Sequence, residues 1–321
     1  MKIAIVGATG KVGRMMLTCL SEFNIKYQTL DLYATVNSAG REIDFENKKY
    51  IVKALSKEAM EYGYDYILFS AGGAVAKEFA PFAAEVGSVV IDNSSAFRQE
   101  VNIPLIVPEI NCNLIRNYEG IIANPNCSTI QLVLLLKPIN EYKKIKKIVV
   151  TTMQSVSGAG YKGISEMQSQ RAGALANNIF PKQIDLNVIP QIGNMSENDY
   201  CEEENKMAFE TRKILNDPSI NISVTTVRVP VVYGHSESVY IEFYDEVVIS
   251  DIINILSGSE AVCYQKDYIT PLEIGESNLS YVSRIRYAGD KKSILLWNVA
   301  HNVRLGAATN AVKILMKCIE K

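Results

Sequence analysis

The chain has 321 residues, of which 48% are hydrophobic, and a formal net charge of −2 at pH 7. This length allows a large buried core and predicts about two domains. The balanced charge excludes a basic footprint for nucleic acid or an anionic membrane, and no apolar run is long enough to span a bilayer. Residues 1–3 lead directly into a predicted strand without a signal-peptide pattern, so we expect a cytoplasmic protein.

The six cysteines show no metal-binding spacing, and a chain of this size does not need a disulfide framework. We therefore expect no metal site and a reducing compartment.

The N-terminal residues have the pattern of a nucleotide-binding unit. Residues 2–6 are typical of a strand, and the glycine-containing turn 7–13 leads into apolar residues at helical spacing. Glycines let the main chain approach a pyrophosphate, and a helix N-terminus favours anions. The pattern GxxGxxG by itself also fits an ordinary strand–helix turn. Further strands are predicted at 28–34, 66–69, 89–91 and 120–123. Their alternation with helices predicts a Rossmann-type, doubly wound parallel sheet.

After residue 127 the pattern changes. Longer strands are predicted at 146–154 and 224–229, and residues 239–243 alternate between apolar and polar. These features favour an α+β domain with a mixed sheet. The glycine-rich stretch 157–163 predicts a loop, and the polar stretch 194–204 predicts a loop or a helix entry.

Cys127 stands between the turn-forming residues 124–126 and the apolar run 130–136, which predicts a buried helix. We expect this cysteine at a helix N-terminus, where unpaired N–H groups and the helix dipole favour a thiolate. A small buried hydrophobic residue is the alternative interpretation. A thiol that needs a base has only two histidines available, His235 and His301.

Other charged residues also allow an interpretation that involves no function. Arg228 precedes His235 by seven residues, and Glu203 and Lys206 lie three apart on a predicted helix. A solvated charged face would explain the last pair without any function.

Several motifs occur together over nearly the whole chain. They are Gly7-Ala8-Thr9-Gly10, Ser70-Ala71-Gly72-Gly73, Asn93-Ser94-Ser95-Ala96-Phe97-Arg98, Asn124-Pro125-Asn126-Cys127-Ser128-Thr129, Gln154 with Ser157-Gly158-Ala159-Gly160, residues 228–236 and residues 297–310. In order and spacing the chain resembles aspartate-semialdehyde dehydrogenases. The resemblance implies reductive dephosphorylation of β-aspartyl phosphate to aspartate semialdehyde, in the biosynthesis of lysine, threonine, methionine and diaminopimelate.

The resemblance also implies roles for single residues. Cys127 would be the nucleophile that forms a thioester, His235 the general acid/base, and Gln154 the residue that orients the thiol and the acyl group. A nearby imidazolium would raise the thiolate fraction further. Substrate binding is implied for Arg228 at the α-carboxylate, Glu203 at the α-ammonium, Arg98 and Lys206 at the phosphate, and Asn126 at the phosphate or oxyanion. Cofactor binding is implied for Gly7, Thr9, Gly10, Lys11, Val12, Thr35, Asn37, Ser38, Ser70, Gly72, Ser157, Gly158 and Asn302.

The implied organisation is a dinucleotide-binding domain of residues 1–126 and 302–321 and a catalytic and dimerisation domain of residues 127–301. The implied partners are small-molecule substrates and further copies of the chain, as a homodimer or homotetramer, with no nucleic acid and no membrane.

Two positions depart from the family pattern. Where the family commonly has an arginine after the second strand, this chain has Asn37, so the usual partner of the NADP 2′-phosphate is missing. Arg41 is a nearby replacement cation, and we expect NADP to be used with weaker discrimination against NAD. His301 replaces the aspartate that usually precedes Asn302, and we expect it at the surface or away from the reacting groups.

Three other functions are alternatives. N-acetyl-glutamyl-phosphate reductases perform the same type of reaction, but their cysteine motif tends to read Asn-Pro-Gly-Cys-Tyr. A thiol hydrolase would not need the nucleotide-binding pattern. A non-catalytic paralogue serving as a binding module would be expected to lack Cys127 or His235, and both are present.

Overall fold

The computed structural model describes residues 1–174 and 177–320, which divide into two compact units. Unit 1 comprises residues 1–126 and 307–321, and unit 2 comprises residues 127–306. The sequence predicted that the chain returns to the first domain at residue 302, whereas in the structure unit 1 resumes at residue 307. Residues 302–306 group with unit 2 because the Asn302 side chain bonds to Ser157 and to the main chain of Gly234.

Unit 1 is built on a six-stranded, fully parallel sheet with the order β5-β2-β1-β6-β7-β8. The strands are β1 (Lys2–Val6), β2 (Thr29–Ala34), β5 (Lys53–Ala54), β6 (Tyr66–Phe69), β7 (Val89–Asp92) and β8 (Ile121–Ala123). The chain reverses its direction of travel across the sheet between β1 and β6. In a doubly wound sheet this switch point is where the loops after the strands open a ligand crevice. The predicted Rossmann-type sheet is confirmed.

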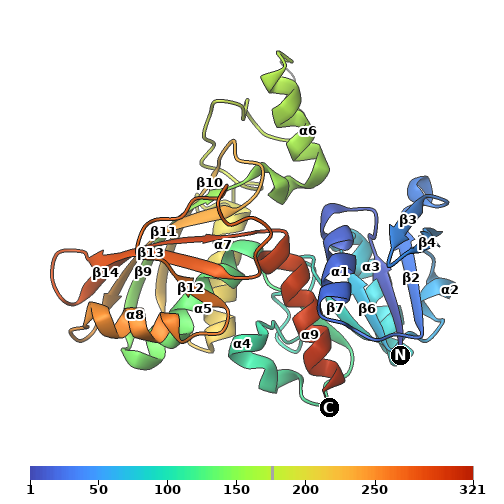
Figure 1. The fold of residues 1–321 in the computed structure, drawn as a ribbon, viewed down its shortest axis with the longest axis horizontal. Helices are drawn as coiled ribbons and strands as arrows, with labels where there is room; N and C mark the ends of the chain where they lie inside the picture. The colour runs from blue at the N-terminus through green and yellow to red at the C-terminus, as the bar shows by residue number, and fades with distance from the viewer. Residues whose placement is uncertain (175–176, 321) are drawn as a thin grey trace. The chain divides into compact units, whose positions relative to one another are not determined.

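Helices cover both faces of this sheet (Figure 1). On one face Ile3 and Ile5 pack with α1 (Lys11–Glu22) and α9 (Asn310–Ile319), and on the other Ala4 and Val6 pack with α3 (Gly73–Glu85). This alternation is what a strand buried on both faces requires. The smaller elements of the unit are α2 (Lys57–Met60), α4 (Pro108–Asn111), the 3₁₀ turns Val36–Ser38 and Cys112–Ile115, and the hairpin of β3 (Glu42–Phe45) and β4 (Lys48–Ile51).

Unit 2 contains a six-stranded mixed sheet with the order β10-β9-β11-β14-β13-β12. The strands are β9 (Ile145–Gln154), β10 (Asn221–Arg228), β11 (His235–Phe243), β12 (Val262–Tyr264), β13 (Ser280–Tyr287) and β14 (Ser293–Ala300). The central strands β9, β11, β14 and β13 pair with one another in antiparallel, whereas the edge strands β10 and β12 pair in parallel with β9 and β13. The mixed sheet is as predicted, although β12 and β13 carry no strong sequence signal.

Three helices pack against one face of this sheet: α5 (Cys127–Tyr142), α7 (Glu202–Leu215) and α8 (Ile249–Ser257) (Figure 1). Along β11 the side chains of Glu237, Val239 and Ile241 are buried on the helix face, while Ser238 and Tyr240 point to the other. The helix predicted at 130–136 is longer than expected and begins at Cys127, as the turn formers before it indicated.

The glycine-rich stretch 157–163 is only partly a loop. A 3₁₀ turn (Val156–Ala159) passes into α6 (Gly160–Arg171), so the prediction of a loop was wrong for its second half. This helix position requires glycine, because a Cβ on Gly163 would lie 2.6 Å from the Val156 carbonyl oxygen. Buried Glu166 of α6 accepts the main-chain N–H groups of 178–180 at 2.7, 2.8 and 3.0 Å, which ties the following loop to the helix.

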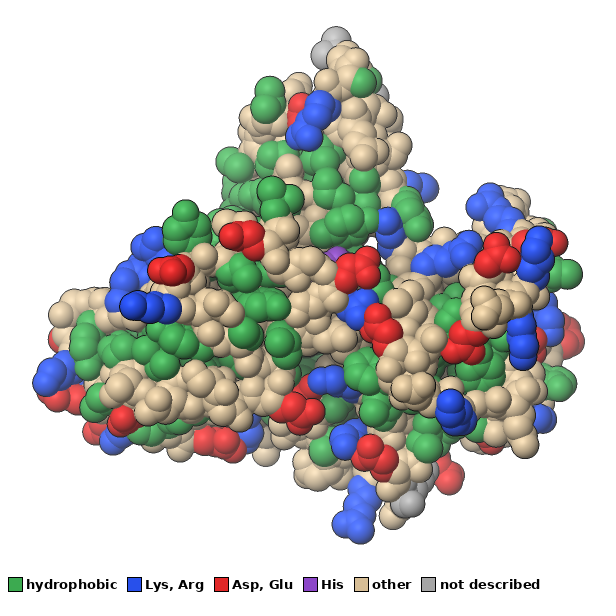
Figure 2. Space-filling view, in the orientation of Figure 1, with side chains coloured by type: hydrophobic (Ala, Val, Ile, Leu, Met, Phe, Trp, Pro, Cys, Tyr) green, Lys and Arg blue, Asp and Glu red, His purple; other side chains and the backbone are tan. Residues whose placement is uncertain are grey.

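Acidic and basic side chains are interspersed on the face drawn in Figure 2, consistent with the near-zero net charge. In the described part of the chain, no helix has the length and apolar composition that crossing a membrane requires.

Candidate active site

In unit 1, the predicted cofactor residues lie in loops after parallel strands. Gly7, Thr9 and Gly10 form the turn between β1 and α1, Lys11 and Val12 open α1, and Ser70 and Gly72 follow β6. Gly7 has φ +86° and a Cβ on it would lie 2.3 Å from the Ser70 carbonyl oxygen, so only glycine fits. The two loops therefore meet at the switch point, where a pyrophosphate would face main-chain N–H groups of α1.

The residues after β2 are more open to solvent. Thr35 and Asn37 are exposed, and Ser38 ends the 3₁₀ turn Val36–Ser38. Arg41 is exposed close by, with its main-chain N–H directed to the Ser38 carbonyl at 3.4 Å. Asn37 thus offers a neutral amide at the position where the resemblance implied an arginine as partner of the 2′-phosphate. Arg41 is a solvated cation nearby.

Arg98 and Asn126 are the predicted substrate residues in unit 1. Both are buried, and the Arg98 guanidinium donates to the Asn93 carbonyl at 3.0 Å. Nearby Asp92 has a pKa raised by burial, an effect that its bonds with Ser94 and the Arg98 charge oppose. Asn126 immediately precedes Cys127 in the chain.

The central feature of unit 2 is a cysteine–histidine pair. Cys127 is the first residue of α5, and its Sγ lies 3.2 Å from Nε2 of His235, the first residue of β11. The helix start places the sulfur at the positive end of the helix dipole. A Cβ on Gly306 would come within 2.7 Å of the Cys127 Cβ, so the main chain at 306 closely flanks the nucleophile.

The sheet register gathers further predicted residues at the same edge. Gln154 ends β9 and pairs directly with Arg228 of β10. On its other side β11 runs antiparallel with Ser236 opposite Met153, so the next position of the register sets His235 beside Gln154. All three side chains are buried on the face that α5 covers. The Gln154 amide donates to Thr152 Oγ1 at 3.3 Å, which restricts its orientation.

The burial of His235 works against the imidazolium that the sequence led us to expect beside the thiol. His235 is fully buried, and desolvation together with the charge of Arg228 holds its pKa well below the usual range. A main-chain hydrogen bond with Gly234 opposes this, and a weaker effect of His301 lowers the pKa further. The surroundings therefore favour the neutral imidazole.

Arg228, Glu203 and Lys206 form the charged part of the unit 2 site. Burial lowers the pKa of Arg228, and the charges of Glu203 and Cys127 oppose this effect. Arg228 therefore lies close enough to Glu203 and to Cys127 to interact with both. The Arg228 Nη1 donates to the Ser155 carbonyl at 2.7 Å. Lys206 Nζ lies 4.0 Å from Glu203 Oε2, with both on α7. The carboxylate is buried, so this pair is more than a solvated face.

Ser157, Gly158 and Asn302, predicted for the cofactor, all belong to unit 2. The Asn302 Oδ1 accepts from the hydroxyls of Ser155 and Ser157 and from the N–H of Gly234, at 3.2, 3.2 and 3.0 Å. A Cβ on Gly158 would lie 2.7 Å from the Arg228 guanidinium. Asn302 thus ties the segment that follows Gln154 to Gly234, the residue before His235.

His301 was expected at the surface or away from the reacting groups, and the surface alternative was wrong. It is buried, its ring stacks on Tyr233 with centroids 5.3 Å apart, and its Nδ1 accepts the main-chain N–H of Arg304 at 3.2 Å. The substitution therefore fills an interior position.

Sequence reasoning missed several groups behind the pair. The main-chain N–H of Ser155 contacts the His235 Nδ1, and Gln131 of α5 donates to the His235 carbonyl at 3.4 Å. Glu237, fully buried, accepts from Asn298 at 2.9 Å. Glu237 could have been found, because a residue two positions from His235 on a strand shares its face.

Among the residues that the structure describes, no three His, Cys, Asp or Glu side chains are grouped so that they could hold a metal ion.

Two family models match the chain. Residues 2–118 match "Semialdehyde dehydrogenase, NAD binding domain", and residues 136–305 match "Semialdehyde dehydrogenase, dimerisation domain". Together with the dinucleotide-binding fold and the thiol–imidazole pair, these matches define a semialdehyde dehydrogenase, an oxidoreductase with a nicotinamide-cofactor domain.

The relatives narrow the class. An aspartate-semialdehyde dehydrogenase of Aquifex aeolicus (strain VF5) is 45% identical over 327 residues, covering 98% of this chain and 96% of the relative. The enzyme of Campylobacter jejuni is 43% identical over 335 residues, covering 99% and 97%. The solved structure of aspartate semialdehyde dehydrogenase II from Vibrio cholerae, complexed with ASA, has a TM-score of 0.96 at 42% identity and covers 100% of this chain and 98% of its own. The chain belongs to the aspartate-semialdehyde dehydrogenase family.

Proposed function

We propose that this chain converts β-aspartyl phosphate to aspartate semialdehyde and phosphate, reversibly, through a thioester on Cys127. The observation that carries this proposal is the 3.2 Å contact between Cys127 Sγ and His235 Nε2 at the start of α5. A thiolate is the nucleophilic form of cysteine, and the helix start together with a hydrogen-bond partner favours it.

The residues of unit 2 fit the substrate. The Arg228 guanidinium is suited to an α-carboxylate because it presents two parallel donors, and Glu203 is suited to an α-ammonium. Lys206 supplies a cation for the phosphate, and Gln154 a fixed amide for the acyl group. Arg98 and Asn126 stay predicted substrate residues.

In the chemical step the thiolate attacks the acyl carbon, the C–S bond forms, and the C–O bond to phosphate breaks. A reduced nicotinamide, when bound, would supply the hydride that converts the thioester to the aldehyde. Departure of the aldehyde breaks the C–S bond and restores the thiolate. The glycine turn of unit 1 fits such a dinucleotide, since Gly7 leaves no room for a side chain.

The decisive experiment uses Cys127→Ala, with Cys112→Ala as the matched control because Cys112 is a half-buried free cysteine of unit 1. Reduction of NADP by aspartate semialdehyde with phosphate is followed. We expect less than about a hundredth of wild-type kcat for Cys127→Ala, because a lost nucleophile costs several kcal/mol. Cys127→Ser should retain at most a trace, and the control should be active. An active Cys127→Ala protein would overturn the covalent mechanism.

For the cofactor we propose NADP, with weaker discrimination against NAD than relatives that carry an arginine at the position of Asn37. Support comes from the exposed, neutral Asn37 and from Arg41, which can supply a more distant cation. Thr35 and Ser38 can donate hydrogen bonds to a phosphate. A missing charge-assisted hydrogen bond is worth about 1.5–3 kcal/mol, or roughly ten- to a hundredfold in preference.

This proposal is tested by kcat/KM for NADP and NAD in the wild type, in Asn37→Arg and in Asn113→Arg. The last variant adds the same charge at another exposed asparagine of unit 1. We expect only Asn37→Arg to raise the NADP preference. A wild-type preference above about a thousandfold, or no change in Asn37→Arg, would show that position 37 is not the selector.

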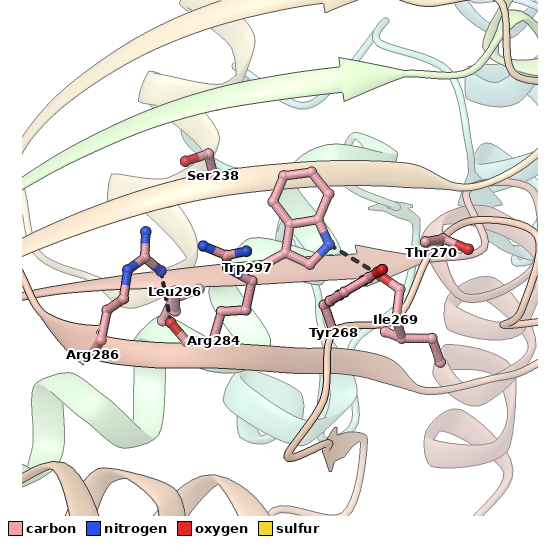
Figure 3. A pocket seen from close by; sticks show the side chains of 8 residues that line it. All are labelled: Ser238, Tyr268, Ile269, Thr270, Arg284, Arg286, Leu296 and Trp297. Atoms are coloured by element: carbon pink, nitrogen blue, oxygen red, sulfur yellow. Dashed lines mark hydrogen bonds between the residues drawn. The ribbon is translucent and has the colours of Figure 1, made fainter.

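We propose further that the chain forms a homodimer or homotetramer through the face of the unit 2 sheet opposite α5, α7 and α8. The matched dimerisation domain supports this. So does the character of the face, where Val149 is 37% exposed and Tyr240, Leu295 and Trp297 are half-buried. A cavity of about 460 Å³ lies on this face. Figure 3 shows its lining side chains, with Trp297 bonded to the Ile269 carbonyl and Arg286 to the Arg284 carbonyl.

Sedimentation of Val149→Asp compared with Val101→Asp tests this surface. Val101 is 92% exposed in unit 1 and serves as the control for the added charge. We expect only Val149→Asp to lower the mass of the assembly, and an unchanged mass would exclude this face.

The six free cysteines favour the reducing cytoplasm as the location of the protein.

A further inference from the structure

One buried carboxylate joins the two elements of unit 2 that carry proposed substrate groups. Glu204 lies in the first turn of α7, next to Glu203, and is 8% exposed. Its Oε2 accepts the main-chain N–H of Cys201, the residue before the helix, at 2.8 Å. Its Oε1 accepts the main-chain N–H of Thr226 in β10 at 2.9 Å. The two oxygens of this carboxylate therefore bridge the start of α7 and the strand β10.

The bond to Thr226 lies on the outer edge of the unit 2 sheet. β10 is the outermost strand and pairs on its inner side with β9. Alternate residues of a strand direct their N–H groups to the same side. The N–H of Arg228 points outward to the Ile189 carbonyl at 2.8 Å, and the N–H of Thr226, two positions earlier, points the same way. Because Thr226 is buried, its N–H requires an acceptor, and Glu204 supplies it.

The bridge of Glu204 connects the neighbours of two substrate groups. Glu203, proposed for the α-ammonium, adjoins it in α7, and Arg228, proposed for the α-carboxylate, lies two residues after Thr226 in β10. The charge of Glu203 opposes the lowering of the Arg228 pKa by burial, so these two groups interact. Their separation depends on how the start of α7 is held against β10. Both oxygens of Glu204 are engaged by main-chain donors, which fits a role in holding this separation.

We propose that Glu204 is a positioning residue that sets the separation between Glu203 and Arg228, and thereby the selectivity for a substrate with both an α-ammonium and an α-carboxylate. The inference rests on the proposed function. A substrate with both groups needs both partners at one separation, whereas an aldehyde with one group can follow its single partner. A glutamine at position 204 has one acceptor oxygen, and its NH₂ group would face the second N–H, so the bridge would open.

Steady-state oxidation of three aldehydes by the full-length Glu204→Gln protein tests the proposal. Aspartate semialdehyde carries both groups, succinic semialdehyde lacks the ammonium, and 3-aminopropanal lacks the carboxylate. We expect kcat/KM for aspartate semialdehyde to fall roughly ten- to a hundredfold, because a misplacement of about 1 Å costs on the order of a hundredfold. The other two aldehydes should lose less than about threefold, since neither uses both partners. A loss of folded enzyme would instead lower all three values by the same factor.

Glu202→Gln is the matched control. It removes the same charge from the same turn of α7, but Glu202 is exposed and accepts from the Asn194 amide at 2.9 Å. Phosphate is kept saturating, so that the pair of Glu202 with Lys206 at 3.7 Å does not affect the comparison. We expect wild-type ratios among the three aldehydes for this control. Equal changes in both variants, or one common factor for all aldehydes in Glu204→Gln, would overturn the proposal.

If Glu204→Gln does not fold, hydrogen exchange on the unaltered chain decides. The Thr226 amide should exchange slowly because it has an acceptor, and exchange as fast as in an unfolded chain would overturn the bridge. The two levels of inference fail differently. A wild-type enzyme with no preference for aspartate semialdehyde over succinic semialdehyde would remove the substrate roles of Glu203 and Arg228. An undiminished preference in Glu204→Gln would remove only the role of Glu204.

Discussion

Replacement of Glu237 by glutamine should stabilise the folded protein near neutral pH. Glu237 is fully buried on β11, and its Oε2 accepts from the Asn298 amide at 2.9 Å. Among the described residues no donor reaches its Oε1, nor the Oε1 of nearby Gln131. Burial raises the pKa of Glu237 to about 8, although hydrogen bonds from Asn298 and Gln131 oppose this. A glutamine would keep the shape, remove the ionisation and add a donor.

The size of the effect follows from the two pKa values. The pKa of Glu237 rises from 4.5 to about 8 on folding, so the folded state binds more protons between these values. Stability is therefore greatest below pH 4.5 and falls as the pH rises to about 8. At 1.36 kcal/mol per pKa unit the loss is about 3 kcal/mol at pH 7 and about 5 kcal/mol above pH 8. Glu237→Gln removes this loss.

Urea unfolding of wild type and Glu237→Gln between about pH 5 and 8.5 measures the effect. The stability difference should grow with pH in favour of the variant. Glu242→Gln is the matched control, because Glu242 lies on the same strand but is partly exposed and paired with Lys146. A difference between Glu237→Gln and wild type that stays constant over this range would refute the reasoning.

Three further substitutions test the packing of the site. Gly306→Ala should displace Cys127, whose Cβ would lie 2.7 Å from the new methyl group, and lower kcat about a hundredfold in steady-state assays; unchanged kcat would contradict this. Arg228→Lys should lower kcat/KM by a similar factor, because one ammonium cannot replace a guanidinium that also bonds to the main chain at 2.7 Å, and wild-type kinetics would count against the assignment. Glu166→Gln should lower the free energy of unfolding by about 1–3 kcal/mol, measured in urea, since an amide cannot accept all three N–H groups of 178–180; an unchanged midpoint would exclude this role.

Some missed elements have identifiable causes. The hairpin β3–β4 turns through Glu46 and Asn47, both with positive φ of 49° and 61°, a conformation that the sequence marks only weakly without glycine. Strand β13 contains Arg284 at φ 54°, where the register with β14 shifts between Ser283 and Arg286. Such a bulge interrupts the alternation on which strand prediction depends.

The sequence by itself determined the features that depend only on residues close together in the chain. The β1–α1 turn follows from glycines that allow positive φ and close packing, and the start of α5 at Cys127 follows from turn formers next to an apolar run. These features depend on φ and ψ preferences and on hydrophobic periodicity, so they are visible without a fold.

The tertiary structure alone decided which groups meet. Cys127 and His235 are 108 residues apart, and their contact depends on the register of β11 and the packing of α5 on the sheet. The donor at His235 Nδ1 is a main-chain N–H of Ser155, a group that every residue except proline carries and that no sequence pattern can single out. The lowered pKa of His235 likewise required its burial beside Arg228, because a pKa depends on solvent exposure and on neighbouring charges that only the folded chain brings together.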